Sequence, residues 1–85
     1  MAKVTLYVKD WCPYCQRAKQ LLASKGVTDI ELIDIEADPE QAAQMMTRTG
    51  RRTVPQIYVG ETHVGGFDDM AALDRAGRLD PLLAG

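Results

Sequence analysis

Hydrophobic and polar positions alternate along the chain in short stretches, some with a period of two residues and others with the period of a helix. Residues 4–8 (Val-Thr-Leu-Tyr-Val) are mostly β-branched or aromatic and alternate with period two, which predicts a strand. Residues 30–35 show the same alternation and predict a second strand. Between them a helix is predicted, with Gly26 as its stop signal, because apolar side chains recur at helical spacing: Cys15, Ala18, Leu21 and Leu22.

A second helix is predicted to begin at Asp38. An acidic side chain suits the N-cap, Pro39 suits the first helical position, and Gln41 stands three residues after the cap. Gly50 marks its end. Four side chains are expected on its inner face, where the methionines would fill gaps in the core: Ala42, Met45, Met46 and Thr49.

The C-terminal part of the chain predicts a third helix and a short helical turn. Asp68 or Asp69 can cap the third helix, which is expected to end at Gly77. Its inward side chains are Met70 and Leu73. The C-terminal turn should cover the remaining core with three leucines: Leu79, Leu82 and Leu83.

A hairpin completes the pattern. Residues 56–59 and 62–64 flank Gly60-Glu61, a pair that suits a two-residue turn, so the last two strands should be antiparallel. The first two strands need a helical crossover and should be parallel. The predicted architecture is an α/β fold in one domain, residues 1–85: a four-stranded mixed sheet, three main helices on its two faces, and a short C-terminal helical turn.

Composition and charge exclude several classes of function. The 85 residues carry ten Lys and Arg against twelve Asp and Glu, a formal net charge of -2, so no basic surplus exists to bind nucleic acid. The apolar runs are far shorter than the roughly 20 residues that span a bilayer. Lys3, Lys9 and Asp10 interrupt what would be the apolar stretch of a signal peptide. We therefore expect a cytoplasmic protein without a membrane partner.

The candidate chemistry is a pair of thiols, Cys12 and Cys15, spaced C-x-x-C. They stand where the first strand gives way to the first helix, with Pro13 in the first helical turn. Free N–H groups and the positive end of the helix dipole favour the thiolate of Cys12, and Lys9 adds positive charge. Cys15 lies one turn further into the helix and should be the more buried thiol. We therefore expect Cys12 to attack and Cys15 to resolve the mixed disulfide.

Two other roles for this pair have to be weighed. A structural zinc ion needs about four ligands, and the one further candidate, His63, lies far away on the hairpin. An inert buried pair would be the simplest alternative, but a C-x-x-C at a strand-to-helix junction favours redox chemistry.

The motif Cys12-Pro13-Tyr14-Cys15 resembles the active site of a glutaredoxin of the small bacterial dithiol type. The resemblance covers essentially the whole chain and includes Lys9, Thr53-Val54-Pro55 and Gly65-Gly66-Phe67-Asp68-Asp69. It implies the thioredoxin fold in its minimal form. It also implies glutathione-dependent reduction of disulfides and of glutathione mixed disulfides.

The resemblance further implies a glutathione-binding groove. Its expected residues come from four places in the chain: Lys9, Tyr14, Thr53, Val54, Pro55, Gly66, Phe67, Asp68 and Asp69. Val54–Pro55 should be a cis peptide facing the cysteines, which leaves the backbone of Val54 free to pair strand-like with the cysteinyl unit. Tyr14 is expected to wall the groove beside Cys12.

The charged ends of glutathione also have expected partners. Gly65-Gly66 allows close approach of the backbone, and the start of the third helix offers N–H groups to the γ-glutamyl carboxylate. Asp68 should pair with the ammonium group, and Asp69 should do the same or cap the helix. Lys9 is the expected partner of the glycyl carboxylate.

The sequence departs from the family pattern at two positions. Phe67 stands where glutaredoxins often have a third cysteine. Ala42 stands where the family places a Gln or Arg for the glycyl carboxylate, which leaves Gln41 as a weak candidate. Trp11 is expected to be surface apolar area near protein substrates. His63 has no evident partner and is expected to be solvated.

The resemblance to glutaredoxins implies that the chain acts as a monomeric oxidoreductase that takes electrons from glutathione and, upstream, from glutathione reductase. The sequence has no flavin or nicotinamide motif, and no metal is expected. Substrates would be glutathionylated or disulfide-containing proteins, with ribonucleotide reductase as a family-level expectation. The alternative is an iron–sulfur cluster carrier, in which two subunits each supply Cys12 and glutathione completes the ligands. A thioredoxin-like protein recycled by thioredoxin reductase is disfavoured by the charged groups at both ends of the groove.

Overall fold

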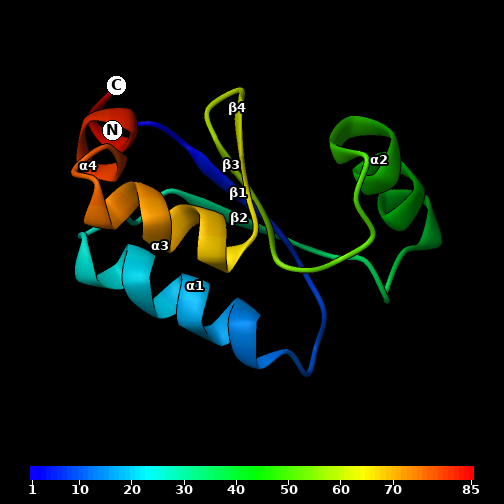
Figure 1. Cartoon of the computed structure of the whole chain (residues 1–85). Helices are drawn as coiled ribbons and strands as arrows, with labels where there is room; N and C mark the ends of the chain where they lie inside the picture. The colour runs from blue at the N-terminus through cyan, green and yellow to red at the C-terminus, as the bar shows by residue number, and fades with distance from the viewer.

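A four-stranded mixed sheet lies at the centre of the computed structural model, which describes all of residues 1–85. Its elements along the chain are β1 (Val4–Val8), α1 (Pro13–Ser24), β2 (Ile30–Asp34), α2 (Pro39–Thr49), β3 (Gln56–Val59), β4 (Thr62–Gly65), α3 (Phe67–Arg75) and α4 (Leu79–Ala84). The strand order is β2-β1-β3-β4 (Figure 1). β1 is parallel to β2 and antiparallel to β3, and β3 is antiparallel to β4. The predicted element order and both predicted strand pairings are confirmed.

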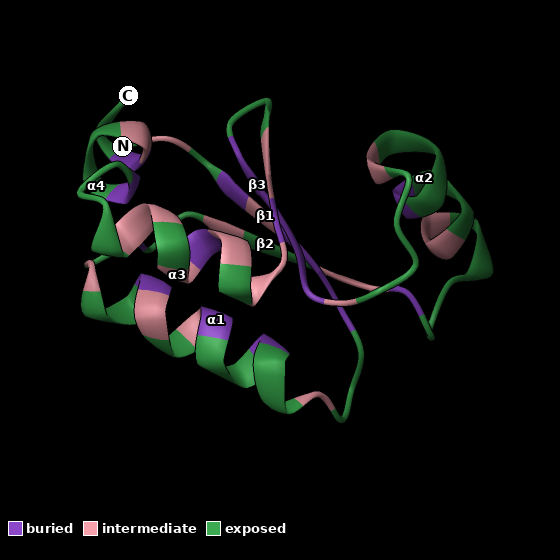
Figure 2. Cartoon of the chain, in the orientation of Figure 1, coloured by how far each residue is buried: buried purple, intermediate pink, exposed green.

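The helices divide the core into two parts. α1 and α3 pack on one face of the sheet, and α2 lies on the other face toward one end (Figure 1). Side chains of β1 alternate between these faces: Leu6 belongs to the large core with α1 and α3, whereas Tyr7 packs with Met45 of α2. α1 is buried on the side that faces the sheet and exposed on the opposite side (Figure 2).

The register between β1 and β3 places two loops at the same end of the sheet. Tyr7 pairs with Gln56, near the last residue of β1 and at the first residue of β3. Because the two strands are antiparallel, the segment that follows β1 and the segment that precedes β3 leave the sheet together. Cys12 lies in the first segment and Val54–Pro55 in the second, so the fold brings these groups side by side.

The ends of α2 match the prediction, but one side chain does not. The Asp38 carboxylate accepts a hydrogen bond from the Glu40 N–H at 3.0 Å, and Gly50 closes the helix with a φ of 71°. Met45 is 1% exposed, as expected for a core residue, but Met46 is 42% exposed. The prediction that Met46 fills the core was therefore wrong. Consecutive helical residues point about 100° apart, which turns Met46 away from the sheet.

α3 begins earlier than the sequence predicted. Gly66 is its N-cap, and Asp69 occupies the third helical position, from which its carboxylate accepts the Gly66 N–H at 2.9 Å. Asp69, one of the two predicted capping residues, therefore does cap the helix, but from the third helical position, because the N-cap residue is Gly66. Gly65 explains the early start, because its φ of 113° turns the chain directly out of β4.

The remaining elements secure the edge of the core. The Gly60-Glu61 turn joins β3 to β4 as predicted, and the C-terminal turn forms α4, with Leu79 and Leu83 buried. The Lys25 ammonium pairs with Asp74 at 2.6 Å and Asp80 at 2.9 Å, which joins the end of α1 to α3 and α4. None of the helices combines the length and the apolar character needed to cross a membrane.

Candidate active site

The two thiols occupy different environments at the start of α1. Cys12 is the N-cap residue, Pro13 follows at the first helical position, and the Cys12 sulfur accepts the Cys15 N–H at 3.2 Å. Cys12 is partly exposed, whereas Cys15 is 1% exposed, and both are free thiols. The Cys12 sulfur also contacts the Val54 carbonyl oxygen at 3.8 Å. Cys12 is thus the thiol that a substrate can reach.

Burial makes Cys15 a weak acid. Removal from water, and then the hydrogen bond with the Cys12 side chain, raise the pKa of the Cys15 thiol from its ordinary 9.0 to about 11. The backbone N–H of Lys9 acts in the opposite direction with a smaller effect on this pKa. Cys15 therefore remains protonated at neutral pH.

A groove of about 360 Å³ lies beside Cys12, between the segment before β3 and the start of α3. Its nine lining residues are Tyr14, Arg51, Thr53, Val54, Pro55, Gly66, Phe67, Asp68 and Asp69. The peptide bond Val54–Pro55 is cis, as expected. Along one wall the rings of Tyr14 and Phe67 lie 6.3 Å apart, centre to centre. The structure thus gathers in one groove eight of the nine residues that the resemblance implied, and it adds Arg51.

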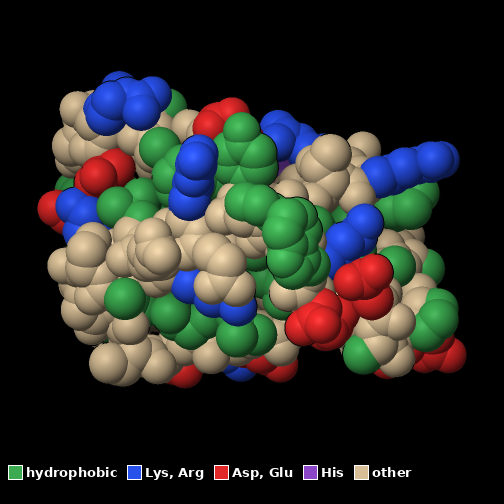
Figure 3. Space-filling model, turned by 90° about the horizontal axis from the view of Figure 1, so that it is seen from below, with side chains coloured by type: hydrophobic (Ala, Val, Ile, Leu, Met, Phe, Trp, Pro, Cys, Tyr) green, Lys and Arg blue, Asp and Glu red, His purple; other side chains and the backbone are tan.

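Two predicted residues lie outside this groove. Lys9 follows β1 and is exposed, and Gln41 lies half-buried in the first turn of α2. Neither lines the groove. Trp11, one residue before Cys12, is 86% exposed, as expected. Figure 3 views the molecule from the side of α1 and shows hydrophobic side chains interspersed with side chains of both charges.

Arg51 was missed by the sequence analysis and forms the most definite ion pair of the groove. Its guanidinium donates to the Asp69 carboxylate at 2.9 Å, and the same carboxylate oxygen accepts the Gly66 N–H. The Gly66 N–H and then the Arg51 guanidinium hold the pKa of Asp69 below its ordinary value. Asp68, by contrast, is exposed and makes no hydrogen bond or ion pair with another side chain. One signal in the sequence could have suggested Arg51: it stands two residues before Thr53, which was expected to line the groove.

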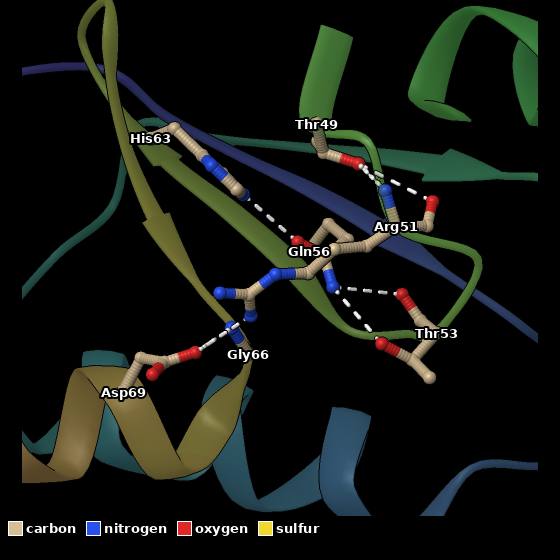
Figure 4. A network of polar contacts seen from close by, with 7 residues as sticks. All are labelled: Thr49, Arg51, Thr53, Gln56, His63, Gly66 and Asp69. Carbon is tan, nitrogen blue, oxygen red and sulfur yellow. Dashed lines mark hydrogen bonds and ion pairs between the residues drawn. The ribbon is translucent and has the colours of Figure 1, made fainter. Parts of the chain in front are cut away.

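His63 is also placed differently from the prediction. It is partly buried, its ring centre lies 5.0 Å from that of Tyr58, and its Nε2 is 2.8 Å from the Gln56 side-chain oxygen (Figure 4). Burial lowers the pKa of His63, and the nearby Arg51 charge lowers it further. The prediction of a solvated His63 without a partner was therefore wrong. Its partner, Gln56, is the one buried polar residue with a functional side chain, and no local pattern reveals its burial.

No group of three or more His, Cys, Asp or Glu side chains gathers in a metal-binding arrangement. The fold and the site define a class: a thioredoxin-like fold with a C-x-x-C pair at the first helix and a cis-proline segment facing it, which is the arrangement of a thiol–disulfide redox protein.

Comparison with known proteins identifies the family within that class. The glutaredoxin family model matches residues 4–64, and the chain belongs to the glutaredoxin family. A glutaredoxin of Pseudomonas aeruginosa is 55% identical over 84 residues, which cover 99% of each chain.

Two solved structures extend the comparison. The buckwheat glutaredoxin–glutathione complex superposes with a TM-score of 0.89 at 30% identity, covering 98% of this chain and 77% of that one. A structure described as "Metal Binding of Glutaredoxins" matches at 52% identity with a TM-score of 0.74, covering 98% of this chain and 89% of the other. The resemblance inferred from the sequence is confirmed.

Proposed function

We propose that this glutaredoxin uses Cys12 to reduce glutathione mixed disulfides of proteins, and Cys12 together with Cys15 to reduce protein disulfides, with glutathione as the reductant. The observation that carries the proposal is the contrast between the thiols. Cys12 is accessible, caps a helix and borders a groove, whereas Cys15 is buried with its pKa raised to about 11. The family and the glutathione complex of the buckwheat relative support glutathione as the ligand.

For a glutathionylated protein the cycle needs only Cys12. Its thiolate attacks the glutathione sulfur, the bond between Cys12 and glutathione forms, and the protein leaves as a thiolate that takes up a proton. The thiolate of a second glutathione then attacks the glutathione sulfur bound to Cys12. Oxidised glutathione leaves, and the Cys12 thiolate is regenerated. One free glutathione is consumed per cycle, because the other half of the oxidised glutathione comes from the substrate, and a separate glutathione reductase converts the oxidised glutathione back to two thiols.

For a protein disulfide the buried thiol takes part. Cys12 attacks one substrate sulfur and forms a mixed disulfide, and the other substrate sulfur leaves as a thiolate. Cys15 then loses its proton and attacks the Cys12 sulfur. The second substrate thiol is released, and a Cys12–Cys15 disulfide closes, which two glutathione molecules reduce. Both thiols belong to one helical turn, a spacing that a disulfide can bridge.

The groove suits an extended tripeptide with charged ends. The backbone of Val54, whose carbonyl lies 3.8 Å from the Cys12 sulfur, can pair with the cysteinyl unit. Free N–H groups at Phe67 and Asp68 can bind the γ-glutamyl carboxylate. Because Asp69 already holds Arg51, we assign the ammonium group to Asp68. Lys9 is exposed and three residues before Cys12, so its flexible side chain is the proposed partner of the glycyl carboxylate.

The wider setting follows from the same chemistry. The substrates would be glutathionylated or disulfide-containing proteins, ribonucleotide reductase among them at the family level. Trp11, exposed beside Cys12, would contact them. The protein would act as a monomer in the cytoplasm, where glutathione keeps thiols reduced.

The test is a turnover assay with a small glutathione mixed disulfide, glutathione and glutathione reductase, followed through NADPH consumption. Turnover that needs both glutathione and the purified protein is the expected result. A parallel reaction replaces the glutathione system with thioredoxin reductase. Turnover only in that second reaction would overturn glutathione as the reductant.

A second function, transfer of an iron–sulfur cluster, is favoured by one observation: the relative described in terms of metal binding is 52% identical. A single chain does not gather three ligands, so a cluster would be held between two chains, each supplying Cys12, with glutathione completing the set. Anaerobic reconstitution with iron, sulfide and glutathione tests this function through visible absorbance and gel filtration. A stable coloured dimer with little thiol-transfer activity would favour the carrier.

A further inference from the structure

Gln56 is the first residue of β3 and follows the cis peptide directly, yet its polar side chain is 0% exposed. Its amide nitrogen donates to the Thr53 carbonyl oxygen at 2.9 Å and to the Thr53 hydroxyl at 3.2 Å. These two bonds use both N–H groups of the amide. The amide thus holds both oxygens of Thr53, the residue that precedes the Val54–Pro55 peptide (Figure 4).

His63 completes this arrangement from the neighbouring strand. The Gln56 side-chain oxygen can only accept, and its partner is the His63 Nε2 at 2.8 Å. His63 must therefore carry a hydrogen on Nε2 and donate it. The ring is held by its contact with Tyr58, 5.0 Å between centres. A chain of hydrogen bonds thus runs from β4 through β3 to the segment that lines the groove (Figure 4).

The segment at the end of this chain is the one that the reaction depends on. Thr53, Val54 and Pro55 line the groove, and the Val54 carbonyl oxygen contacts the Cys12 sulfur. Within this segment Pro55 is buried and Val54 packs against the core, whereas Thr53 is exposed. Thr53 therefore depends most on the hydrogen bonds from Gln56 for its position. A binding segment that is already ordered loses less conformational freedom when its ligand arrives, and it therefore binds more tightly.

We propose that His63 is a positioning residue for glutathione: by donating to Gln56, it fixes the amide that holds Thr53–Val54–Pro55 in the conformation that binds the tripeptide. The inference rests on the proposed function, because it assigns His63 a role in that groove. His63 contacts neither thiol. Its loss should weaken binding of glutathionylated substrate and leave the chemical step at Cys12 unchanged.

Two substitutions at position 63 separate the hydrogen bond from simple packing. His63→Phe keeps an aromatic ring beside Tyr58 but has no donor, and leaves a buried acceptor on Gln56 unpaired. His63→Gln loses the ring but places an amide N–H at about the same distance from the backbone. We expect His63→Phe to raise KM for the glutathione mixed disulfide about tenfold, equivalent to about 1.4 kcal/mol, with kcat within about twofold.

The matched variant decides the interpretation. We expect His63→Gln to keep KM within about twofold of the wild-type value. Equal rises in KM for both variants would overturn the proposal in favour of ring packing, as would an unchanged KM in His63→Phe. Gln56→Met provides an independent route, since it removes the amide. In Gln56→Met, KM for the glutathione mixed disulfide should rise by about the same factor as in His63→Phe. The double variant Gln56→Met/His63→Phe should have the same KM as Gln56→Met alone. Additive effects of the two substitutions on KM would show that the two residues do not act through one hydrogen bond.

Hydrogen exchange keeps this inference distinguishable from the proposed function. The side-chain amide protons of Gln56 should exchange faster in His63→Phe than in the wild type or His63→Gln, whatever the turnover. If the wild-type protein shows no glutathione-dependent turnover, the proposed function fails while exchange still reports on the network. Unchanged exchange in His63→Phe would overturn the positioning role, and so would faster exchange without a change in KM.

Discussion

Replacing each active-site thiol in turn should separate the two reactions. Cys15→Ser should retain reduction of a glutathione mixed disulfide, because that cycle needs only Cys12 and external glutathione. The same variant should lose most of its activity on a substrate closed by an intramolecular disulfide, where Cys15 resolves the mixed disulfide. Cys12→Ser should lose both activities, because the remaining thiol is 1% exposed and protonated.

The magnitude follows from the pKa of Cys15. With that pKa at about 11, compared with an ordinary 9.0, only about one Cys15 in 10⁴ is ionised at pH 7, a hundredfold less than an ordinary thiol. Thiol–disulfide exchange requires the thiolate, so its rate falls in proportion to the ionised fraction of Cys15. Cys12→Ser removes one cause of the raised pKa, the bond from the Cys12 side chain, but the larger cause, burial, remains. Residual activity should therefore stay below about 1% of the wild-type activity.

The loss in Cys15→Ser has a different origin. A neighbouring thiol acts at an effective concentration that can reach about 10⁵ M, whereas external glutathione acts at its actual millimolar concentration. We expect resolution of a protein mixed disulfide to slow at least about a hundredfold. Each variant is assayed on both substrate types after circular dichroism confirms that it is folded.

Alkylation provides the check on the physical cause. In Cys12→Ser, the rate of Cys15 alkylation should increase about tenfold per pH unit and continue to rise toward pH 11, because only the thiolate reacts. A plateau near pH 9 would show that burial does not control Cys15. Retention of more than about a tenth of the wild-type turnover by Cys12→Ser would refute the assignment of nucleophile and resolving thiol.

Three further substitutions test the groove and the residues that hold the start of α3. Asp68→Lys should raise KM for glutathionylated substrate about tenfold through loss of a charge-assisted bond, while Asp29→Lys, an exposed control with the same charge change, should not; steady-state kinetics measures both. Asp69→Ala should destabilise the fold by about 1 kcal/mol at pH 7 in urea unfolding. Because the folded-state pKa of Asp69 is lowered, this contribution is present above the unfolded-state value of about 3.9 and disappears as pH falls through the lower folded value. Gly65→Ala, with a φ of 113° and a Cβ pressed against the Asp69 carboxylate, should lower stability by about 2 kcal/mol or more, whereas Gly26→Ala, with a φ of 76° and open space around it, should lower it by about 1 kcal/mol.

The parts of this fold that the sequence predicted are those set by local signals. Each of these elements is specified by residues that are close together in the sequence. They are the strand at residues 4–8, the helix that begins after Cys12, and the two caps of α2, Asp38 and Gly50. The start of α3 was misplaced because two signals competed. Asp69 does accept an N–H, but from the third helical position, a role that a sequence pattern does not separate from that of the cap residue.

The parts that the sequence did not reveal depend on contacts between distant segments. Arg51 meets Asp69 across 18 positions, and His63 meets Gln56 through an amide that is fully buried, although glutamine is usually exposed. In the sequence alone, each of these residues resembles an ordinary exposed polar residue. Their pairing requires β3 and β4 to be adjacent and α3 to begin beside them.

The same reasoning explains why the sequence could tell the exposed thiol from the buried one, while the groove needed the structure. The difference between Cys12 and Cys15 is a difference of one helical turn, so a strand-to-helix junction already fixes which thiol is exposed. The groove instead takes one wall from the segment before β3 and the other from the start of α3. Tyr14 joins them only because β1 ends and β3 begins at the same edge of the sheet. A residue such as Gln41, chosen by counting along the sequence, therefore fell outside the groove, whereas Arg51, which lies near no thiol in the sequence, is part of it. The hydrogen bonds of Gln56 with Thr53 and His63 also depend on the pairing of neighbouring strands. Their contribution should therefore be measured through the affinity for glutathione.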